Sequence, residues 1–242
     1  MEFLKESLEK IISVFFKIYF LVNPAEKNSE NLDKALDLYK GKGFVELFSE
    51  IRTWDAPFES IESKVPIQGV IVDLGSGDGL LGNYLAIASP KRHVFGIELN
   101  KERVKNSYKG FKNTKFLYGN ILKADIPKAD CILLVHVLHH LNSFDEQEKL
   151  IEKCKTKLRK GGKLLIVEIS EQPFSKYMFT KFTDMVIVPI LFENRIFNPN
   201  INFRKISDWR KLLKNFGFNV KVSYPHKGKP FSHVLFEAYP VS

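Results

Sequence analysis

The first 62 residues show the spacing of amphipathic helices. Apolar side chains recur every three or four positions over 4–19, which predicts a helix that ends before Pro24. The same spacing predicts two further helices, at 32–39 and 44–51. The second half of the first helix is apolar nearly all round, which is typical of a helix that is buried or lies against an apolar partner. We therefore expect residues 1–62 to form a helical N-terminal cap or lid.

From Gly69 the pattern changes to short apolar runs that alternate with helical spacing. Strands are predicted at 70–74, 93–99, 115–118, 131–135 and 163–169, and helices at 80–88, 101–108 and 143–158 lie between them. Ser143 and Glu146 form a capping box at the start of the last of these helices, and Gly161-Gly162 is expected to end it. Such alternation is typical of a parallel sheet that helices cover on both faces.

The alternation lapses over 172–205, a stretch rich in Phe, Ile, Val and Pro. It resumes with Ser207 as the N-cap of a helix over 208–215, followed by strands at 218–224 and 233–239. The short linker between these strands favours an antiparallel pair. The chain is thus predicted to be α/β, with a seven-stranded, mostly parallel Rossmann-like sheet whose last strand is antiparallel, and with an insertion that forms a lid before strand six.

Composition narrows the class of protein. With 242 residues, 44% hydrophobic, the chain suits one domain with an appendage. Its two cysteines lack a CxxC spacing, which argues against a disulfide framework and favours a reducing cytoplasm. A secretory signal is not expected, because the first ten residues mix acidic and basic side chains. A membrane span is not expected, because Lys17 interrupts an apolar run that is already short. The formal net charge of +9 permits attraction to phosphate without requiring it.

The segment Val72-Asp-Leu-Gly-Ser-Gly-Asp-Gly79 forms a glycine loop between a predicted strand and helix. Such a loop lets the backbone approach a ligand closely, and enzymes that bind NAD or S-adenosylmethionine (SAM) both use one. The G-x-G-x-G spacing and Leu80, which stands where a dinucleotide fingerprint needs a small residue, disfavour NAD. Glu98 ends the next strand and can accept hydrogen bonds from both hydroxyls of a ribose.

Five segments in order, VDLGSGDG, VFGIELN, FLYGNI, CILLVHVLHHL and LRKGGKLLIVEIS, resemble the successive motifs of class I SAM-dependent methyltransferases. The resemblance covers about 69–170, and VLHHL is most similar to the small-molecule branch, which includes enzymes that methylate quinones and other lipids. It implies a methyltransferase domain over 63–242, SAM as cofactor and S-adenosylhomocysteine as product. The cofactor site that it implies consists of Asp73, Gly75, Ser76, Gly77, Gly79, Glu98, Leu99, Asn120, Ile121 and His136.

Within that implied site, Gly75, Ser76 and Gly77 would pass the methionine part of SAM, and Glu98 would hold the ribose. Asn120 departs from the family's commonest residue, which is Asp, although an amide oxygen can still accept a hydrogen bond from the adenine amino group.

Methyl transfer needs a base only if the acceptor must lose a proton. His136, which follows the fourth strand, is the leading candidate, because imidazole titrates near neutral pH. The alternative is a histidine that fixes a loop. His139 and Glu168 are further candidates. No metal is expected, because no acid accompanies the histidines at ligand spacing in the sequence. No Asn/Asp-Pro-Pro-aromatic motif follows the fourth strand, which argues against methylation of a nucleic-acid base at its amino group.

The N-terminal extension and the insertion are both rich in aromatic residues, and we predict that they fold over the cofactor cleft. The predicted lining of an apolar substrate pocket is Phe16, Tyr19, Phe20, Trp54, Tyr177, Phe182 and Met185. An ordinary helical core is the alternative. Apolar faces flanked by Lys17, Lys176 and Lys181 also suit peripheral contact with an anionic membrane and a lipid-like acceptor. An RNA or protein methyltransferase and a non-catalytic SAM-binding protein stay open, as does the oligomeric state.

Overall fold

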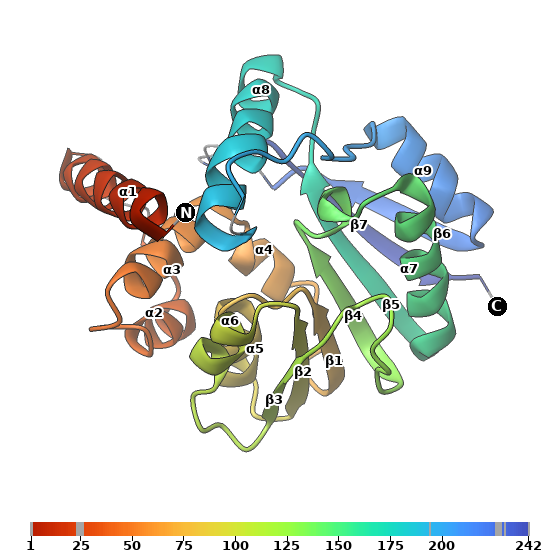
Figure 1. The fold of residues 1–242 in the computed structure, drawn as a ribbon. Helices are drawn as coiled ribbons and strands as arrows, with labels where there is room; N and C mark the ends of the chain where they lie inside the picture. The colour runs from red at the N-terminus through yellow and green to blue at the C-terminus, as the bar shows by residue number, and fades with distance from the viewer. Residues whose placement is uncertain (1, 23–26, 194, 226–228, 230, 242) are drawn as a thin grey trace.

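A seven-stranded sheet forms the centre of the computed structural model, which describes residues 2–22, 27–193, 195–225, 229 and 231–241 (Figure 1). The strands are β1 (Gly69–Leu74), β2 (Arg92–Glu98), β3 (Thr114–Tyr118), β4 (Ala129–Val135), β5 (Leu158–Ile169), β6 (Phe218–Ser223) and β7 (His233–Pro240). The helices are α1 (Glu2–Val22), α2 (Glu30–Asp37), α3 (Phe44–Asp55), α4 (Phe58–Glu62), α5 (Leu80–Ala88), α6 (Lys101–Ser107), α7 (Phe144–Lys157), α8 (Phe174–Phe182) and α9 (Ile206–Asn215), with short helical turns η1 (Leu138–His140), η2 (Thr183–Ile187) and η3 (Pro189–Glu193).

The strand order is β3-β2-β1-β4-β5-β7-β6, and β7 alone runs antiparallel to its neighbours. The predicted fold class is therefore confirmed. The chain moves outward from β1 through β2 to β3 and then returns to place β4 on the other side of β1. In open α/β sheets a ligand binds at the carboxyl ends of the strands where the order reverses in this way. The fold thus places a site beyond the ends of β1 and β4.

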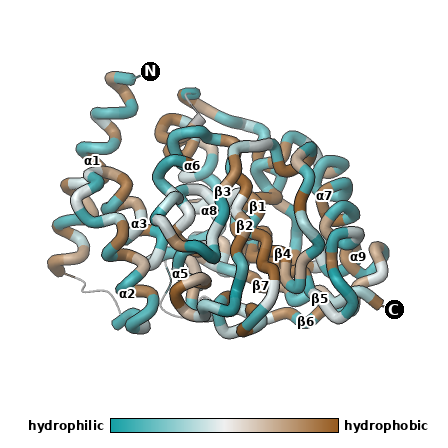
Figure 2. The backbone as a smooth tube through the Cα atoms, turned by 90° about the horizontal axis from the view of Figure 1, so that it is seen from below, coloured by the Kyte–Doolittle hydropathy of each residue, from teal (hydrophilic) through white to brown (hydrophobic). Residues whose placement is uncertain are grey.

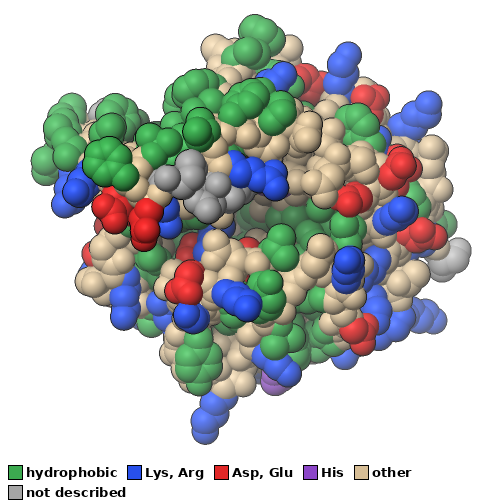
Figure 3. Space-filling model, in the orientation of Figure 1, with side chains coloured by type: hydrophobic (Ala, Val, Ile, Leu, Met, Phe, Trp, Pro, Cys, Tyr) green, Lys and Arg blue, Asp and Glu red, His purple; other side chains and the backbone are tan. Residues whose placement is uncertain are grey.

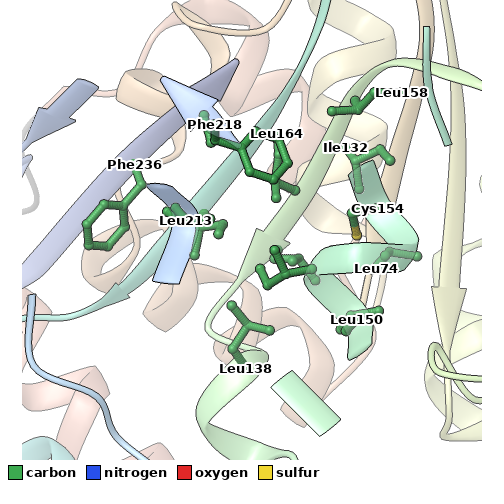
Figure 4. Packing of buried hydrophobic residues seen from close by; sticks show 14 of the residues in the cluster. Leu74, Ile132, Leu138, Leu150, Cys154, Leu158, Leu164, Leu213, Phe218 and Phe236 are labelled. Atoms are coloured by element: carbon green, nitrogen blue, oxygen red, sulfur yellow. The ribbon is translucent and has the colours of Figure 1, made fainter. Parts of the chain in front are cut away.

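Successive side chains of the central strands point to opposite faces of the sheet and pack into two separate hydrophobic cores. Leu74 and Ile132 pack with Leu150 of α7 and Leu213 of α9 on one face of the sheet (Figure 4). Ile71 points to the opposite face, among buried residues of α2, α4 and α5. This period of two follows from strand geometry and explains the nearly continuous apolar runs of β1 and β4. Figure 2 shows these strands as a hydrophobic stretch of the backbone inside more hydrophilic helices.

The N-terminal 62 residues contribute to two parts of the structure. Helices α2 and α4 are part of the layer that covers the sheet beside α5, since Leu32, Phe58 and Ile61 are buried in its core. Only α1 projects away from this layer, with no buried residue (Figure 1). The shorter helices of the predicted unit 1–62 thus carry apolar stripes that fit the layer on the sheet. None of the described helices is long and apolar enough to cross a bilayer.

Local signals in the sequence predicted most element boundaries, but the end of α7 and the start of α9 differ. Helix α7 ends at Lys157, before Gly161-Gly162, because the chain already enters β5 at Leu158. Helix α9 begins at Ile206 with Lys205 as its N-cap, so Ser207 lies inside it. At α7 the predicted cap is present: Ser143 Oγ accepts a hydrogen bond from the Glu146 amide at 3.2 Å. The predicted helix end at Pro24 and most of the linker at 225–230 lie outside the described residues.

Candidate active site

The glycine loop after β1 has a backbone that ordinary side chains would disturb. Gly75 and Gly77 have φ angles of +80° and +57°, in the left-handed region. A Cβ atom on Gly75 would lie 2.5 Å from Cγ2 of Val137. The amides of Gly75 and Ser76 donate to the Ile97 carbonyl at 2.8 and 3.0 Å, which holds the loop against β2. The loop thus has a fixed backbone conformation at the end of β1.

Glu98 connects this loop to the next strand end. Its Oε2 accepts a hydrogen bond from the Gly77 amide at 2.9 Å, and its Oε1 accepts one from the Asn100 amide at 2.8 Å. Each carboxylate oxygen keeps a lone pair for another donor. Because Glu98 also lines the neighbouring cavity, it can accept hydrogen bonds from a bound polyol.

A cavity of about 560 Å³ opens beside the loop, and it is lined by several of the residues predicted for a cofactor: Gly75, Glu98, Leu99, Asn120, Ile121 and His136. An adjoining recess is lined by Asp73, Ser76 and Gly77. Gly79, the N-cap of α5, lines neither of them, and a Cβ atom on it would lie 2.4 Å from Cβ of Ser107. Asn120 uses Oδ1 to accept from the Leu122 amide at 2.8 Å, so only its remaining lone pair could serve an adenine.

Two buried polar groups in the recess suit a cationic, polar ligand. Ser76 Oγ is buried and has no hydrogen-bond partner in the part of the chain that is described. Burial, with the nearby charge of Glu98, raises the pKa of Asp73 to about 7. A positive ligand group beside Asp73 would favour its ionised form, and a polar one would satisfy Ser76.

Two arginines also border the recess. The Arg52 guanidinium donates to Asp55 Oδ2 at 2.6 Å, and the Arg103 Nε donates to Asp78 Oδ2 at 2.9 Å. A Cβ atom on Gly77 would lie 2.5 Å from Arg103 Nη2, so this guanidinium lies over the loop. Both side chains line the recess, where they would favour a carboxylate.

His136 lies within a closed ring of hydrogen bonds. Arg52 can only donate, so its bond of 3.1 Å makes His136 Nδ1 an acceptor. Nε2–H then donates to His233 Nδ1 at 3.0 Å, and His233 Nε2–H donates to the Asp55 carbonyl at 2.9 Å. Asp55 completes the ring by accepting from Arg52. Burial and the nearby Arg52 charge hold the pKa of His136 well below its ordinary value.

Both ring nitrogens of His136 are engaged in this structure, which disfavours its predicted role as the base. The residue has a φ of +55°, which is uncommon outside glycine. It lines both the 560 Å³ cavity and a second chamber, described next. His136 thus forms part of the wall between the two cavities.

The second chamber has a volume of about 150 Å³ and lies between the strand ends and the insertion. Its lining combines apolar side chains with histidines: Phe48, Arg52, Asp55, Gly75, Arg103, Val135, His136, His139, His140, Ile169, Thr180, Asp184, Val188, Phe192 and Phe231. It shares Gly75, His136 and His140 with the larger cavity, so the two adjoin. Figure 3 shows this face of the molecule hollowed below the insertion.

His139 is the buried histidine of this chamber. Its Nδ1 lies 2.6 Å from Glu168 Oε2, and Glu168 Oε1 accepts from the Leu138 amide at 3.0 Å. Asp184 Oδ2 lies 3.5 Å from His139 Nε2. Burial alone would lower the pKa of His139, but the charge and hydrogen bond of Glu168, with the charge of Asp184, outweigh it and raise the pKa. Burial raises the pKa of Asp184 to about 6.

A family model described as an O-methyltransferase domain matches residues 58–219, more than half of the chain. The chain belongs to the O-methyltransferase family. Within it, the flavonoid 4'-O-methyltransferase of Glycine max is 31% identical over 76% of this chain and 47% of that protein. The probable O-methyltransferase 3 of Humulus lupulus is 28% identical over 76% of this chain and 45% of its own length. The chain thus spans about half the length of the curated relatives it matches.

The crystal structure of human N-acetylserotonin methyltransferase in complex with SAM has the same fold. It superposes with a TM-score of 0.60 at 19% identity, over 89% of this chain and 61% of that one. The fold described above is therefore that of a class I methyltransferase, as the resemblance in the sequence implied.

The O-methyltransferase fold places the residues predicted for substrate away from the chamber. Phe16, Tyr19 and Phe20 of α1 pack against Trp54 of α3, with ring centroids 5.2 to 6.0 Å from the Trp54 ring. Three further residues were predicted from the insertion: Tyr177, Phe182 and Met185. Tyr177 packs on Phe203, Phe182 is 56% exposed, and the Met185 carbonyl accepts from Asn198. None of the seven lines the chamber, because α1 lies outside it and the insertion turns other side chains inward.

Sequence reasoning missed four charged or polar residues of this site: Arg52, Arg103, Asp184 and His233. Arg52 comes from α3, Asp184 from η2 and His233 from the start of β7, so only the fold brings them together. A signal was available for Asp184, which is a lone acid within an apolar stretch of the insertion. His233 gave none, because its pairing with Ile169 of β5 follows from strand register.

Proposed function

We propose that this protein is a SAM-dependent O-methyltransferase that methylates a hydroxyl group of a small aromatic molecule. One observation carries the proposal: a histidine oriented by a carboxylate, His139 with Glu168, lines a chamber that adjoins the cavity beside the glycine loop. The proposal takes His139 as a base that lies next to the position where a methyl donor would end. Family membership and the SAM-bound structural relative support the choice of donor.

The residues present fit SAM. The partnerless Ser76 Oγ and the glycine backbone suit the methionine part, and Arg52 and Arg103 would hold its carboxylate. Glu98 would accept from the ribose hydroxyls, and Leu99 would pack on the adenine. When bound, the sulfonium of SAM supplies the methyl group and leaves as a neutral thioether.

The proton chemistry belongs to His139. Because Glu168 accepts from Nδ1–H, the lone pair of His139 lies on Nε2. In the proposed reaction Nε2 takes the proton of the acceptor hydroxyl while its oxygen forms a bond to the methyl carbon. The resulting imidazolium lies between Glu168 and Asp184, whose negative charges stabilise it. His136, held in its ring, fixes the boundary between donor and acceptor.

The chamber supports an aromatic acceptor of modest size. A cavity of about 150 Å³ is known to admit benzene, and this chamber has about that volume. Apolar side chains such as Phe48, Phe192 and Phe231 form much of its wall. The Glycine max relative is named for a flavonoid acceptor, which belongs to the proposed class of hydroxylated aromatic molecules although it is larger than benzene.

The test is formation of S-adenosylhomocysteine with a panel of hydroxylated aromatics. We expect turnover by the parent with at least one phenol and a loss of about 10²- to 10⁴-fold in His139→Asn, the usual contribution of a general base. The matched control is His93→Asn, an exposed histidine of β2. Equal rates for the parent and His139→Asn would contradict the proposed base, and no turnover with any hydroxylated aromatic would contradict the proposed acceptor class.

A further inference from the structure

The histidine pair of η1 meets an acid from the insertion. One ligand atom each from His139, His140 and Asp184 can be chosen so that all lie within 4.8 Å of one another. We propose that these three residues form a binding site for a divalent transition-metal ion of the zinc class. The expectation of no metal rested on spacing along the sequence, which could not reveal an acid 44 residues beyond His140.

Two of the three ligands carry a buried atom that makes no hydrogen bond in the described part of the chain. His140 Nδ1 and Asp184 Oδ2 are both buried and without a hydrogen bond to any described residue. Asp184 is 9% exposed, and its Oδ2 faces His139 Nε2 at 3.5 Å. A buried polar atom without a partner costs about 1 to 3 kcal/mol. A bound cation would satisfy both atoms at once.

The third ligand is already oriented for a metal. Ligating histidines usually donate their second ring N–H to a carboxylate, which fixes the tautomer and raises the basicity of the ligating nitrogen. His139 does this with Glu168 at 2.6 Å, and Glu168 is itself held by the Leu138 amide at 3.0 Å. Phe203 stacks on the His139 ring at a centroid distance of 4.8 Å, which shields this side from water.

The ligand chemistry indicates zinc or a similar ion. Two imidazoles with one carboxylate are ligands that Zn²⁺ accepts at about 2.0 to 2.2 Å, in a tetrahedral arrangement with one position left for water or substrate. Such bond lengths place the ligand atoms roughly 3.3 Å apart, so the present spread of up to 4.8 Å must close by about 1.5 Å. The fourth position would face the acceptor chamber, which all three residues line.

A metal ion bound at this site would affect the proposed reaction, because it would occupy the proposed base. A metal bound to His139 Nε2 uses the lone pair that takes the acceptor's proton, so the loaded protein would be inhibited. This consequence rests on the proposed function, whereas metal binding itself does not.

Titration of tag-free, chelator-treated protein with ZnCl₂ in a calorimeter tests the site. We expect one ion per chain, and an affinity at least about tenfold lower in Asp184→Asn and in His140→Phe. His93→Asn, which removes an exposed histidine, should bind like the parent. Thermal melting of each variant without metal shows that it is folded.

The outcomes separate this inference from the proposed function. No zinc binding by the parent, or equal binding by the parent and both variants, would overturn the metal site. SAM titrated into the same samples provides the second readout. A protein that binds zinc through these residues but not SAM would contradict the proposed function alone.

Discussion

Glu168→Gln offers a sharp test of the proposed base, because the two carboxylate oxygens each face a donor. Oε1 accepts from the Leu138 amide at 3.0 Å, and Oε2 accepts from His139 Nδ1 at 2.6 Å. Glutamine has one oxygen and one NH₂ group, so one of these donors must lose its acceptor. Turning the NH₂ group to the Leu138 amide would leave that buried N–H unsatisfied, at a cost of about 1 to 3 kcal/mol.

The favoured arrangement turns the NH₂ group to His139 instead. It then donates to Nδ1 and moves the ring proton to Nε2, so the base has no lone pair in the chamber. We expect a rate loss of about 10²- to 10⁴-fold, equivalent to roughly 3 to 5 kcal/mol in the barrier. Initial rates at saturating SAM measure it, with Glu152→Gln on the exposed face of α7 as the control.

The pH profile distinguishes this tautomer effect from a loss of charge. The pKa of His139 is raised above its ordinary 6.5, so the parent rate should rise with pH through a midpoint above that value. If Glu168 acted through its charge alone, the variant would lose no rate at high pH, and its midpoint would move down by about 1 to 3 units. A Glu168→Gln protein with the parent rate at high pH would therefore refute the tautomer argument.

Three further predictions concern the cofactor and the core. Glu98→Gln should weaken SAM binding by about 1.5 to 3 kcal/mol by calorimetry, while the exposed Glu102→Gln binds like the parent. SAM affinity should fall as pH is lowered through about 7, where Asp73 takes up a proton that a cationic ligand must displace; affinity independent of pH over this range would contradict it. Leu134→Ala, fully buried in β4, should cost about 2 to 5 kcal/mol in urea unfolding, and a cost no larger than that of the 42% exposed Leu117→Ala would refute this.

The sheet could be predicted because its signals are local. Helix α5 has the predicted bounds 80–88, since Gly79 and Pro90 frame an apolar stretch between them. Helix α4 was missed, because five residues are too few to show a helical period. The start of β5 was misplaced, because an irregular register between Ala129 and Cys131 of β4 lets pairing begin early at Leu158.

The residues of the candidate site also differ in how far the sequence could predict them. Cofactor residues such as Glu98 follow directly from strand ends and glycine spacing, and the fold brought them to one cavity. The choice between His136 and His139 could not be made from the sequence. It depends on Arg52 and His233, which occupy both nitrogens of His136.

The predicted membrane contact stays a prediction, and it concerns the exposed apolar side chains of α1 and α8. Phe3, Phe15 and Leu21 of α1 are 58 to 83% exposed, as is Phe174 at the start of α8. Figure 3 shows hydrophobic side chains gathered over these helices. The predicted contact with an anionic lipid surface is tested by vesicle flotation of the parent against a form without residues 1–22. Equal amounts of both in the unbound fraction would contradict it.

The most direct measurement of the central claim follows the methyl group itself. The protein is incubated with SAM carrying a deuterated methyl group and with the phenol that gives turnover, and the product is located by mass spectrometry and NMR. The account predicts that the labelled methyl appears on the hydroxyl oxygen, and that His139→Asn forms this product about 10²- to 10⁴-fold more slowly while still binding SAM. A label on carbon or nitrogen, or equal product from the parent and His139→Asn, would contradict it.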